Sequence, residues 1–315
     1  MVTGGAGFIG SHVVDRLIQD KYEVIVFDNL SQGLNENIEG HLDNPQFTLQ
    51  KEDIKNKDKI NNALIDAYAV INLAAIVSVI RSIQEPELVH NINVTGNLNL
   101  LNTSLKQNVK KFIFASSAAI YGANENLPLK IDYPFNPLSP YAASKVAGEA
   151  YCQAYHETYG LNTIILRFMN IYGPRSIGIY SGVITKFSEA ITKKKPLTIY
   201  GDGEQTRDFT YVTDAVDTIL LALNTKEAQG KTFNIGTGKP TSINQLANLF
   251  KNITNNPKQQ IQYKDPRKGE IKHSYADITK TTKILGHKPK INLETGIQKY
   301  LKWYQKTKYT PTNTE

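Results

Sequence analysis

The chain has 315 residues, of which 40% are hydrophobic and 21% charged, proportions that are ordinary for a water-soluble globular protein and that exclude the disordered and fibrous classes. The formal net charge is +7, but the lysines are scattered and their one run, residues 193–195, stands before a proline, which favours a solvated surface over a nucleic-acid footprint. The longest apolar stretch, residues 69–80, is too short to span a bilayer.

In the first half of the chain, short apolar or β-branched runs alternate with longer segments of helical periodicity. The predicted strands are residues 22–27, 47–50, 69–73, 111–115 and 162–167. The predicted helices are residues 11–19, 57–67, 89–107 and 141–159, the last opened by Ser139 and Pro140 in capping positions. Such alternation is typical of a parallel sheet covered by helices, so we predict a Rossmann-like, doubly wound α/β fold.

The pattern changes after Arg167, where glycine, proline and tyrosine become frequent. We predict a helix over residues 182–192 and a strand over residues 197–200, closed by a glycine turn at residues 201–203. We expect a frayed tail at residues 309–315. The chain therefore divides into a Rossmann domain, residues 1–166 and 208–237, and a smaller α/β substrate-binding lobe, residues 167–207 and 238–308.

A glycine-rich segment stands where the first strand passes into the first helix. It reads Thr3-Gly-Gly-Ala-Gly-Phe-Ile-Gly10, with Gly4, Gly7 and Gly10 at the spacing of a dinucleotide-binding turn. Glycines permit a tight turn and let the backbone approach a pyrophosphate, whose charge the helix N-terminus then binds. A lone match of this kind is weak, because many such segments are ordinary turns.

Asp28 adds weight to the glycine pattern. It stands at the end of the next predicted strand, where a carboxylate can accept hydrogen bonds from the ribose hydroxyls of a dinucleotide. The same carboxylate would repel a 2′-phosphate, so the pattern favours NAD over NADP. The alternative, in which Asp28 is only a strand-ending turn residue, stays open on these residues alone.

Tyr141 and Lys145 form a candidate catalytic pair. Four residues apart in a predicted helix, they lie on one helix face, and we expect Lys145 and an oxidised nicotinamide to lower the pKa of the Tyr141 phenol. Ser116 and Ser117 follow a predicted strand, at the edge where parallel sheets place ligand-binding groups. A Tyr-x-x-x-Lys pair alone occurs often by chance, whereas together with the glycines and serines it indicates catalysis by a serine, a tyrosine and a lysine.

Other residue types give no sign of a metal site or a disulfide. The six histidines show no i, i+3 or i, i+4 pairing with one another or with cysteine, so we predict no metal. Cys152, the one cysteine, is expected to be a small buried apolar residue. The N-terminus lacks the features of a signal peptide, and we expect a cytoplasmic protein.

With these motifs in place, the chain resembles the extended short-chain dehydrogenase/reductase family, and within it the NAD-dependent nucleotide-sugar epimerases of the UDP-glucose and UDP-N-acetylglucosamine 4-epimerase type. The resemblance covers nearly the whole chain. The residues that carry it are Thr3 to His12, Asp28-Asn29 with Ser31 and Gly33, Asp53-Ile54, Leu73-Ala74-Ala75, Asn93 with Gly96, Ser116 to Gly122, Ser139-Pro140-Tyr141 with Ser144-Lys145, Arg167 with Asn170 and Arg175, Gly201 to Phe209, and Arg267 with Gly269.

The resemblance implies roles for individual residues. Ser117, Tyr141 and Lys145 would be catalytic. The cofactor-binding residues would be Gly4, Gly7, Phe8, Ile9, Gly10, Asp28, Asn29, Ser31, Gly33, Asp53, Ile54, Leu73, Ala74, Ala75 and Asn93, with Tyr141 and Lys145. The substrate-binding residues would be Val77, Ser117, Asn170, Val183, Tyr200, Arg207, Arg267 and Ser274; arginines suit this task because a guanidinium matches phosphate oxygens in a bidentate way.

The resemblance also implies a reaction. Tyr141 would take the proton of the sugar 4-hydroxyl while hydride leaves C4 for NAD, and the 4-keto sugar would turn and take the hydride back on its other face. Related dehydratases and decarboxylases carry an acidic residue just after the strand-end serine or threonine, whereas this chain has Ala118 and Ala119. Epimerisation is therefore favoured over a dehydratase or another net oxidoreductase.

Three further expectations follow. Ser274 stands where epimerases restricted to small hexoses have a tyrosine, so the pocket would have room for a 2-acetamido group. A non-catalytic NAD-binding module is the alternative of another class, and it predicts the loss of a catalytic residue, whereas Ser117, Tyr141 and Lys145 are all present. The helices predicted at 89–107 and 141–159 correspond to those that pair subunits in the family, so we expect a homodimer that binds a UDP-sugar, and neither nucleic acid nor membrane.

Overall fold

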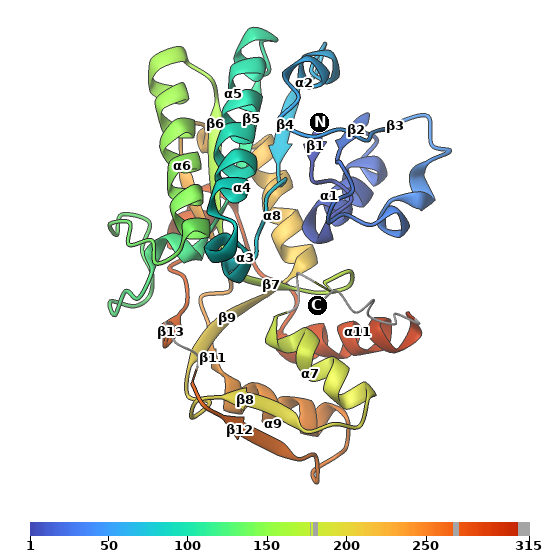
Figure 1. Ribbon diagram of the computed structural model, residues 1–315, viewed down its shortest axis with the longest axis vertical. Helices are drawn as coiled ribbons and strands as arrows, with labels where there is room; N and C mark the ends of the chain where they lie inside the picture. Colours follow the sequence, from blue (N-terminus) through green and yellow to red (C-terminus); the bar gives the residue numbers. More distant parts are fainter. Residues whose placement is uncertain (177, 179–181, 267–270, 308–315) are drawn as a thin grey trace.

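The computed structural model describes residues 1–176, 178, 182–266 and 271–307, and these form two lobes (Figure 1). The large lobe is built around a seven-stranded sheet. Among the described residues, the small lobe contains the remaining strands together with the helices α7, α9 and α11, and it lies beneath the large lobe in Figure 1.

The large sheet has the strand order β10-β6-β5-β4-β1-β2-β3, and each neighbouring pair is parallel. Connections run outward from β1 in both directions, so the strand order reverses between β1 and β4. This is the doubly wound architecture that the sequence predicts, and the prediction is confirmed. The strands are β1 Val2–Thr3, β2 Val24–Phe27, β3 Phe47–Gln50, β4 Ala69–Asn72, β5 Lys111–Ser117, β6 Thr163–Phe168 and β10 Thr232–Ile235.

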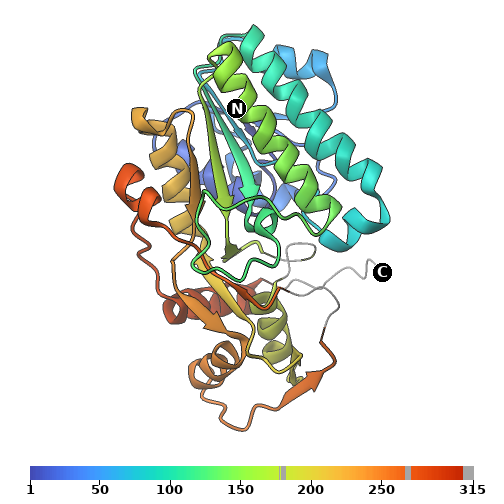
Figure 2. The same ribbon diagram turned by 90° about the vertical axis from the view of Figure 1, so that its left-hand side faces the viewer.

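Helices cover both faces of this sheet, as Figure 2 shows for α5 and α6 on one side and α8 and α10 on the other. Alternation along β5 explains the two layers, since Phe112 and Phe114 belong to one buried cluster and Ile113 and Ala115 to the other. The helices of the large lobe are α1 Phe8–Gln19, α2 Lys57–Ala63, α3 Val79–Gln84, α4 Pro86–His90, α5 Asn97–Lys106, α6 Pro140–Tyr159, α8 Val212–Asn224 and α10 Thr279–Leu285.

Most predicted elements lie within a few residues of the observed ones, and local chemistry explains their ends. In α6, the Ser139 side chain accepts a hydrogen bond from the Ala142 N–H, Pro140 occupies the first turn, and Gly160 ends the helix in the left-handed region at φ 72°. The predicted strand at 111–115 continues to Ser117, so Ser116 and Ser117 both belong to β5 and both pair with β6.

The helix predicted over residues 89–107 is wrong in detail. The structure has α4, then a π-helical turn at Asn91–Gly96, then α5. The start moves back to Pro86, which suits the first turn of a helix because it lacks an N–H. Apolar periodicity does not reveal a π turn, because the wider turn is an insertion set by tertiary contacts.

The small lobe contains two further sheets. In one, β9 Thr206–Tyr211 pairs in parallel with β7 Asn170–Tyr172 and β13 His273–Ser274 and antiparallel with β11 Pro240–Ser242; in the other, β8 Leu197–Tyr200 pairs in parallel with β12 Ile261–Lys264. Its helices are α7 Val183–Thr192, α9 Ile243–Ile253 and α11 Leu293–Lys306.

Short 3-10 helices occur outside the small lobe, at Asn35–Asn37, Glu39–His41, Ala118–Tyr121 and Lys226–Ala228.

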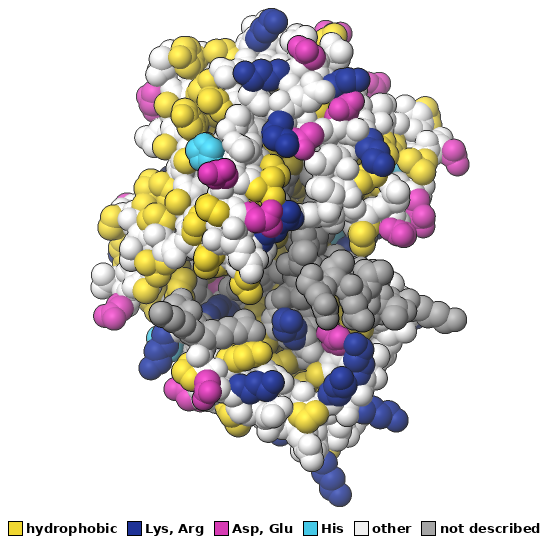
Figure 3. All heavy atoms as spheres, in the orientation of Figure 1, with side chains coloured by type: hydrophobic (Ala, Val, Ile, Leu, Met, Phe, Trp, Pro, Cys, Tyr) yellow, Lys and Arg dark blue, Asp and Glu magenta, His cyan; other side chains and the backbone are white. Residues whose placement is uncertain are grey.

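The two parts of the chain differ in charge. Residues 1–166 and 208–237 contain 14 basic and 21 acidic side chains, whereas residues 167–207 and 238–308 contain 22 basic and 7 acidic ones. Figure 3 shows the consequence on one face, where basic side chains are spread over the small lobe and both signs are mixed on the large lobe. Across the described residues, every helix is too short or too polar to traverse a lipid bilayer.

Candidate functional site

The candidate site lies at the edge of the large sheet where β1 and β4 end. Connections leave these two strands in opposite directions, which opens a crevice outside their carboxyl ends. Gly4 follows β1 with φ +67°, and a Cβ there would lie 2.8 Å from the Ala74 nitrogen. Glycine is therefore required at Gly4 for both its conformation and its close contact with the segment that follows β4.

The glycine turn leads into the N-terminus of α1. Gly7 is the N-cap residue and has no side chain to satisfy the first N–H groups of the helix. Gly10 allows the first turn to pack against the strand end, because a Cβ there would lie 2.1 Å from the Gly4 carbonyl oxygen. The result is a helix terminus with open N–H groups and a positive dipole end, an arrangement that suits a pyrophosphate.

Asp28 joins the glycine turn to the next strand. Its Oδ2 accepts a hydrogen bond from the Ala6 N–H at 3.0 Å and its Oδ1 accepts one from the Leu30 N–H at 2.9 Å. Burial raises the pKa of this carboxyl, and the two backbone N–H groups act in the opposite direction. Each oxygen keeps a lone pair, so Asp28 can fix the turn and still accept hydrogen bonds from a ribose.

A cleft lies beside these residues, and most predicted cofactor-binding positions line it: Gly4, Gly7, Asp28, Asn29, Ser31, Gly33, Asp53, Ile54, Leu73, Ala74 and Ala75. The structure adds five lining residues that sequence reasoning missed: Phe27, Gln32, Glu52, Ile76 and Ile92. Within the described chain, Gln32 Oε1 is buried without a hydrogen-bond partner. An orphaned acceptor in a cleft is typical of a ligand site, so the residues present fit a dinucleotide.

The other predicted cofactor-binding residues do not line this cleft: Phe8, Ile9, Gly10, Asn93, Tyr141 and Lys145. Phe8 is buried in the core and its ring packs edge-on against His12. Asn93, in the π turn, accepts a hydrogen bond from the Ile76 N–H at 2.8 Å and donates to the Ile76 carbonyl at 3.0 Å and to Ser144 Oγ at 3.0 Å. Asn93 thus holds the segment after β4 against α6. It fixes the position of Ile76, which lines the cleft, without lining the cleft itself.

A second set of buried polar groups supports the same segment and was missed from the sequence. Thr3 Oγ1 donates to Asn72 Oδ1 at 2.7 Å and accepts from the Ala74 N–H at 3.3 Å, and Asn72 Nδ2 donates to Asn97 Oδ1 at 2.8 Å. Polar residues at the ends of two neighbouring apolar strands were the available signal. Their partners are far apart in the chain, so the contacts themselves could not be predicted.

The candidate catalytic residues come from β5 and α6. Ser117 ends β5, where its hydroxyl accepts a hydrogen bond from the Ala119 N–H at 3.2 Å, and it also hydrogen bonds the Tyr141 phenol. Burial raises the pKa of Tyr141, and the Ser117 hydrogen bond acts in the opposite direction. The lowered pKa that the sequence analysis expects is therefore not a property of the chain alone, because loss of solvent outweighs the other contributions.

Lys145 lies one helical turn after Tyr141 and is buried with it. Its ammonium donates to the Ala115 carbonyl at 2.7 Å and lies 5.9 Å from the centre of the Tyr141 ring. Burial lowers the pKa of Lys145 to about 8. Ser117, Tyr141 and Lys145 therefore meet at the carboxyl edge of β5, and this cluster can hold a hydroxyl and move its proton.

The predicted substrate-binding residues are distributed over both lobes. Asn170, Arg207 and Ser274 lie on β7, β9 and β13, and Arg207 and Ser274 are register partners. Arg207 donates to the Thr206 carbonyl at 2.8 Å. Val77 lies between β4 and α3, Val183 begins α7 and Tyr200 ends β8. Arg267 lies outside the described residues.

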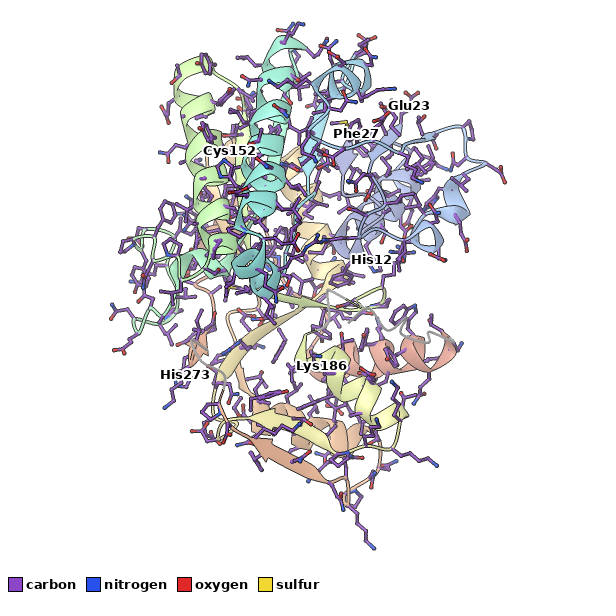
Figure 4. The ribbon with its side chains drawn as sticks, viewed as in Figure 1. His12, Glu23, Phe27, Cys152, Lys186 and His273 are labelled. Atoms are coloured by element: carbon purple, nitrogen blue, oxygen red, sulfur yellow. The ribbon has the colours of Figure 1, made fainter. Side chains whose placement is uncertain are left out.

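His12 connects the two lobes near the glycine turn. Figure 4 shows it on the side of α1 that faces the small lobe, where its Nε2–H donates to the Pro174 carbonyl at 2.9 Å. Pro174 follows β7, so the helix that begins at the glycine turn contacts the chain as it enters the small lobe. Figure 4 also places Cys152 within α6, where it is fully buried.

A switch-point crevice with a glycine turn, an acidic strand end and a buried serine, tyrosine and lysine defines a dinucleotide-dependent enzyme of the dehydrogenase type. Comparison with known proteins makes this specific. Residues 1–236 match the model of the NAD dependent epimerase/dehydratase family, and the chain belongs to that family. The family and the cofactor NAD that the sequence predicts are thereby confirmed.

The similarity extends over whole chains. The chain is 42% identical to the putative UDP-glucose 4-epimerase of Methanocaldococcus jannaschii, over 98% of this chain and 99% of that protein. Among solved structures it is similar to UDP-glucose 4-epimerase with UDP-glucose from Thermotoga maritima (41% identity, TM-score 0.91, 97% and 98% of the two chains). It is also similar to UDP-N-acetylglucosamine 4-epimerase from Methanobrevibacter ruminantium in complex with UDP-N-acetylmuramic acid (39% identity, TM-score 0.90, 96% of each chain).

Proposed function

We propose that the protein is a UDP-sugar 4-epimerase that interconverts UDP-glucose and UDP-galactose through a transient 4-keto sugar. The observation that carries this proposal is the buried cluster of Ser117, Tyr141 and Lys145 followed by a turn, Ala118–Tyr121, that contains no carboxyl group. A net elimination or decarboxylation needs a second acid or base, which this turn does not supply. Removal and return of hydrogen at one carbon, with NAD as hydride acceptor, needs no acid or base beyond the residues present.

In this reaction the chain's own residues move a proton and hold the sugar. Tyr141 accepts the proton of the sugar 4-hydroxyl. Ser117, which hydrogen bonds the Tyr141 phenol, orients the sugar hydroxyl. Lys145 places a positive charge beside the phenol and favours its ionised form. Held by the glycine turn, the α1 N-terminus and Asp28, NAD would supply the hydride acceptor and donor that this reaction needs. Burial of both side chains keeps water from competing for the proton.

The two lobes would divide the binding between them. The large lobe would hold NAD through the glycine turn, the α1 N-terminus and Asp28, with the adenine against Asp53 and Ile54. The small lobe would hold the UDP-sugar through Asn170, Val183, Tyr200, Arg207, Arg267 and Ser274, with Val77 contributed from the large lobe. This division follows the residue ranges predicted from the sequence, 1–166 and 208–237 against 167–207 and 238–308.

Acceptance of N-acetylated sugars is the finer part of the proposal. Ser274 is buried at 8% exposure, and its backbone is tied to Arg207 by the pairing of β13 with β9. A serine at this position leaves volume that a tyrosine would occupy, and a 2-acetamido group needs that volume. Similar solved structures include enzymes named for both UDP-glucose and UDP-N-acetylglucosamine.

A product assay tests the proposal. The protein with NAD is incubated separately with UDP-glucose, UDP-N-acetylglucosamine and UDP-glucuronic acid, the products are separated, and absorbance at 340 nm is followed. We expect the 4-epimers of the first two sugars and no lasting NADH signal. Stoichiometric NADH would instead indicate net oxidation, a dehydrated product would indicate a dehydratase, and no product from any sugar would favour a non-catalytic NAD-binding module. Turnover of UDP-glucose alone would overturn the N-acetyl part.

We also propose that two copies pair through the helical segments predicted at 89–107 and 141–159, and that α3, which packs beside α6, extends this face. Ile80 and Ile83 on α3 are 71% and 64% exposed, and Tyr151 and Tyr159 on α6 are 39% and 56% exposed. Apolar side chains of this size rarely gather on a free surface. Light scattering should give twice the mass of one chain, and Ile83→Lys should shift the protein towards one copy; a monomeric parent protein would exclude the pairing.

A further inference from the structure

The face of α6 that carries the catalytic pair bears a third ionisable side chain. Tyr141, Lys145 and Glu149 follow one another at intervals of four residues, which places them on one helix face. Lys145 donates to the Ala115 carbonyl at 2.7 Å, and the hydroxyl of the next residue, Ser116, donates to Glu149 Oε1. Successive residues of β5 therefore hold the lysine and the glutamate side by side.

The helix lies unusually close to the strand at this point. Gly148 allows it, because a Cβ there would lie 2.3 Å from the ring of Phe114. The Lys145 ammonium lies 5.1 Å from the centre of the same ring. The space around Lys145 and Glu149 is thus closed to water, and both side chains are only 4% and 3% exposed.

Arg167, on the neighbouring strand β6, fixes the Glu149 carboxylate. Its Nε donates to both carboxylate oxygens at 3.0 and 3.1 Å, and its second terminal nitrogen donates to Oε2 at 2.7 Å. The remaining terminal nitrogen donates to the Tyr121 hydroxyl and to the Ile131 carbonyl, each at 2.8 Å. Arg167 is therefore fully engaged, and Glu149 has one position in which all its partners are satisfied.

The same network reaches the small lobe. The Tyr121 hydroxyl donates to Asn234 Oδ1 at 2.7 Å, and Asn234 Nδ2 donates to the carbonyls of Leu129 and Asp277 at 2.8 and 3.2 Å. Leu129 also pairs with the chain just after Ser274, since its N–H donates to the Tyr275 carbonyl at 2.8 Å. The network therefore links the catalytic helix to the segment that carries the predicted sugar-specificity residue.

A lone ammonium in such a place is costly, and an opposite charge nearby reduces the cost. The ionisable or charged groups around Lys145 are Tyr141, Glu149 and Cys152 from α6 and, behind Glu149, Arg167 from β6; β5 contributes Phe114, Ala115 and Ser116, which carry no charge. We propose that Glu149 is a positioning residue for catalysis: held by Arg167 and Ser116, it supplies the negative charge that keeps Lys145 protonated beside Tyr141.

The role of Glu149 adds to the proposed epimerase and rests on it only for the catalytic consequence. Burial lowers the pKa of Lys145 to about 8, and Glu149 acts against this decrease. Removing the Glu149 charge should therefore deprotonate Lys145 within the range in which the enzyme works. Tyr141 would then lose the positive charge that favours its ionised form.

The test compares Glu149→Gln with Glu149→Asp in the NAD-loaded protein. Lysine labelled with ¹³C at Cε reports the protonation of Lys145, whose signal is assigned by its loss in Lys145→Arg, and no substrate is needed. Glu149→Gln should move the Lys145 titration to lower pH by about one unit or more, whereas Glu149→Asp should leave it near the parent value. In the product assay, the alkaline limb of kcat should move in the same direction for Glu149→Gln while KM changes little.

A purely structural role would lower the stability of both variants and leave the Lys145 titration in place, and that result would overturn the inference. If Glu149→Gln does not fold, the double variant Glu149→Gln/Arg167→Gln removes the carboxylate together with its guanidinium partner, so that no buried guanidinium is left unpaired. The Lys145 titration of this double variant should still lie below that of the parent protein, and an unshifted titration would again overturn the inference. If Glu149→Gln shifts the Lys145 titration but the parent protein has no epimerase activity, the electrostatic role of Glu149 stands and the proposed function fails.

Discussion

The large and small lobes differ in how they present their candidate binding groups. In the large lobe these groups are backbone N–H groups at a glycine turn and a carboxylate held by two backbone bonds, in a part of the chain with more acidic than basic residues. In the small lobe most of them are polar side chains on strands, among them Asn170, Tyr200 and Arg207. Residues 167–207 and 238–308, which form most of this lobe, contain 22 basic and 7 acidic side chains. Backbone geometry suits one unvarying ligand, whereas side chains can be exchanged to suit different sugars.

The junction of the lobes should be the most sensitive point. Tyr141→Phe removes one hydroxyl from the catalytic cluster and should lower kcat by about 10²- to 10⁴-fold, the usual contribution of a general base. The melting temperature should hardly change, because the ring and its packing remain. Tyr68→Phe, at an exposed tyrosine just before β4, is the matched control and should retain full activity; equal activity of the two variants would exclude Tyr141 as the base.

Within the large lobe, the buried charge of Lys145 should lower the stability of the folded protein. Its folded pKa is about 8 against 10.5 in the unfolded chain, so below pH 8 the folded protein bears a cost of about 3 kcal/mol, which vanishes as pH rises to 10.5. Lys145→Met should therefore unfold at higher urea concentration than the parent cofactor-free protein at pH 7, and at nearly the same concentration at pH 10.5.

Lys302 is exposed, so Lys302→Met is the control for this measurement and should leave stability unchanged at both pH values. A Lys145→Met protein that is less stable than its parent at pH 7 would show that the Ala115 hydrogen bond and packing of the lysine outweigh the cost of burying its charge.

The glycine turn gives a smaller effect. Helix propensity alone would favour Gly10→Ala by about 1 kcal/mol, but the new Cβ would lie 2.1 Å from the Gly4 carbonyl oxygen. The backbone must shift, and restoring the parent turn for NAD binding should cost about 1–3 kcal/mol. This corresponds to a loss of NAD affinity of about fivefold to 150-fold. Calorimetry measures it, with Gly40→Ala as the control because nothing lies within 4 Å of a Cβ there. Unchanged affinity in Gly10→Ala would place the pyrophosphate elsewhere.

The smallest expected effect comes from the unequal charge of the two lobes. Basic residues of the small lobe should attract the nucleotide diphosphate, so kcat/KM for UDP-glucose should fall by about threefold to tenfold between 50 mM and 500 mM salt. Binding of NAD to the large lobe should change less over the same range. Equal salt dependence of the two measurements would mean that the uneven charge has no part in substrate encounter.

The features of this protein that depend on local sequence pattern could be predicted from the sequence. The alternation of strands and helices, the glycine turn and the acidic strand end are encoded by neighbouring residues, and the fold and family predicted from them are confirmed. The π turn that directs Asn93 to Ile76, and the pairing of Thr3 with Asn72, depend on contacts between distant segments. Burial, which raises the pKa of Tyr141 in the chain without cofactor, is likewise set by the whole fold and could not be predicted from neighbouring residues.

The central claim is that hydrogen leaves one carbon of the sugar and returns to that carbon within a single site. UDP-glucose carrying deuterium at C4, incubated with the NAD-loaded protein in ordinary water, tests this most directly when the product is examined by NMR and mass spectrometry. The account predicts UDP-galactose that retains deuterium at C4, since hydride never exchanges with solvent. A product with ordinary hydrogen at C4, or one altered at another carbon, would contradict it.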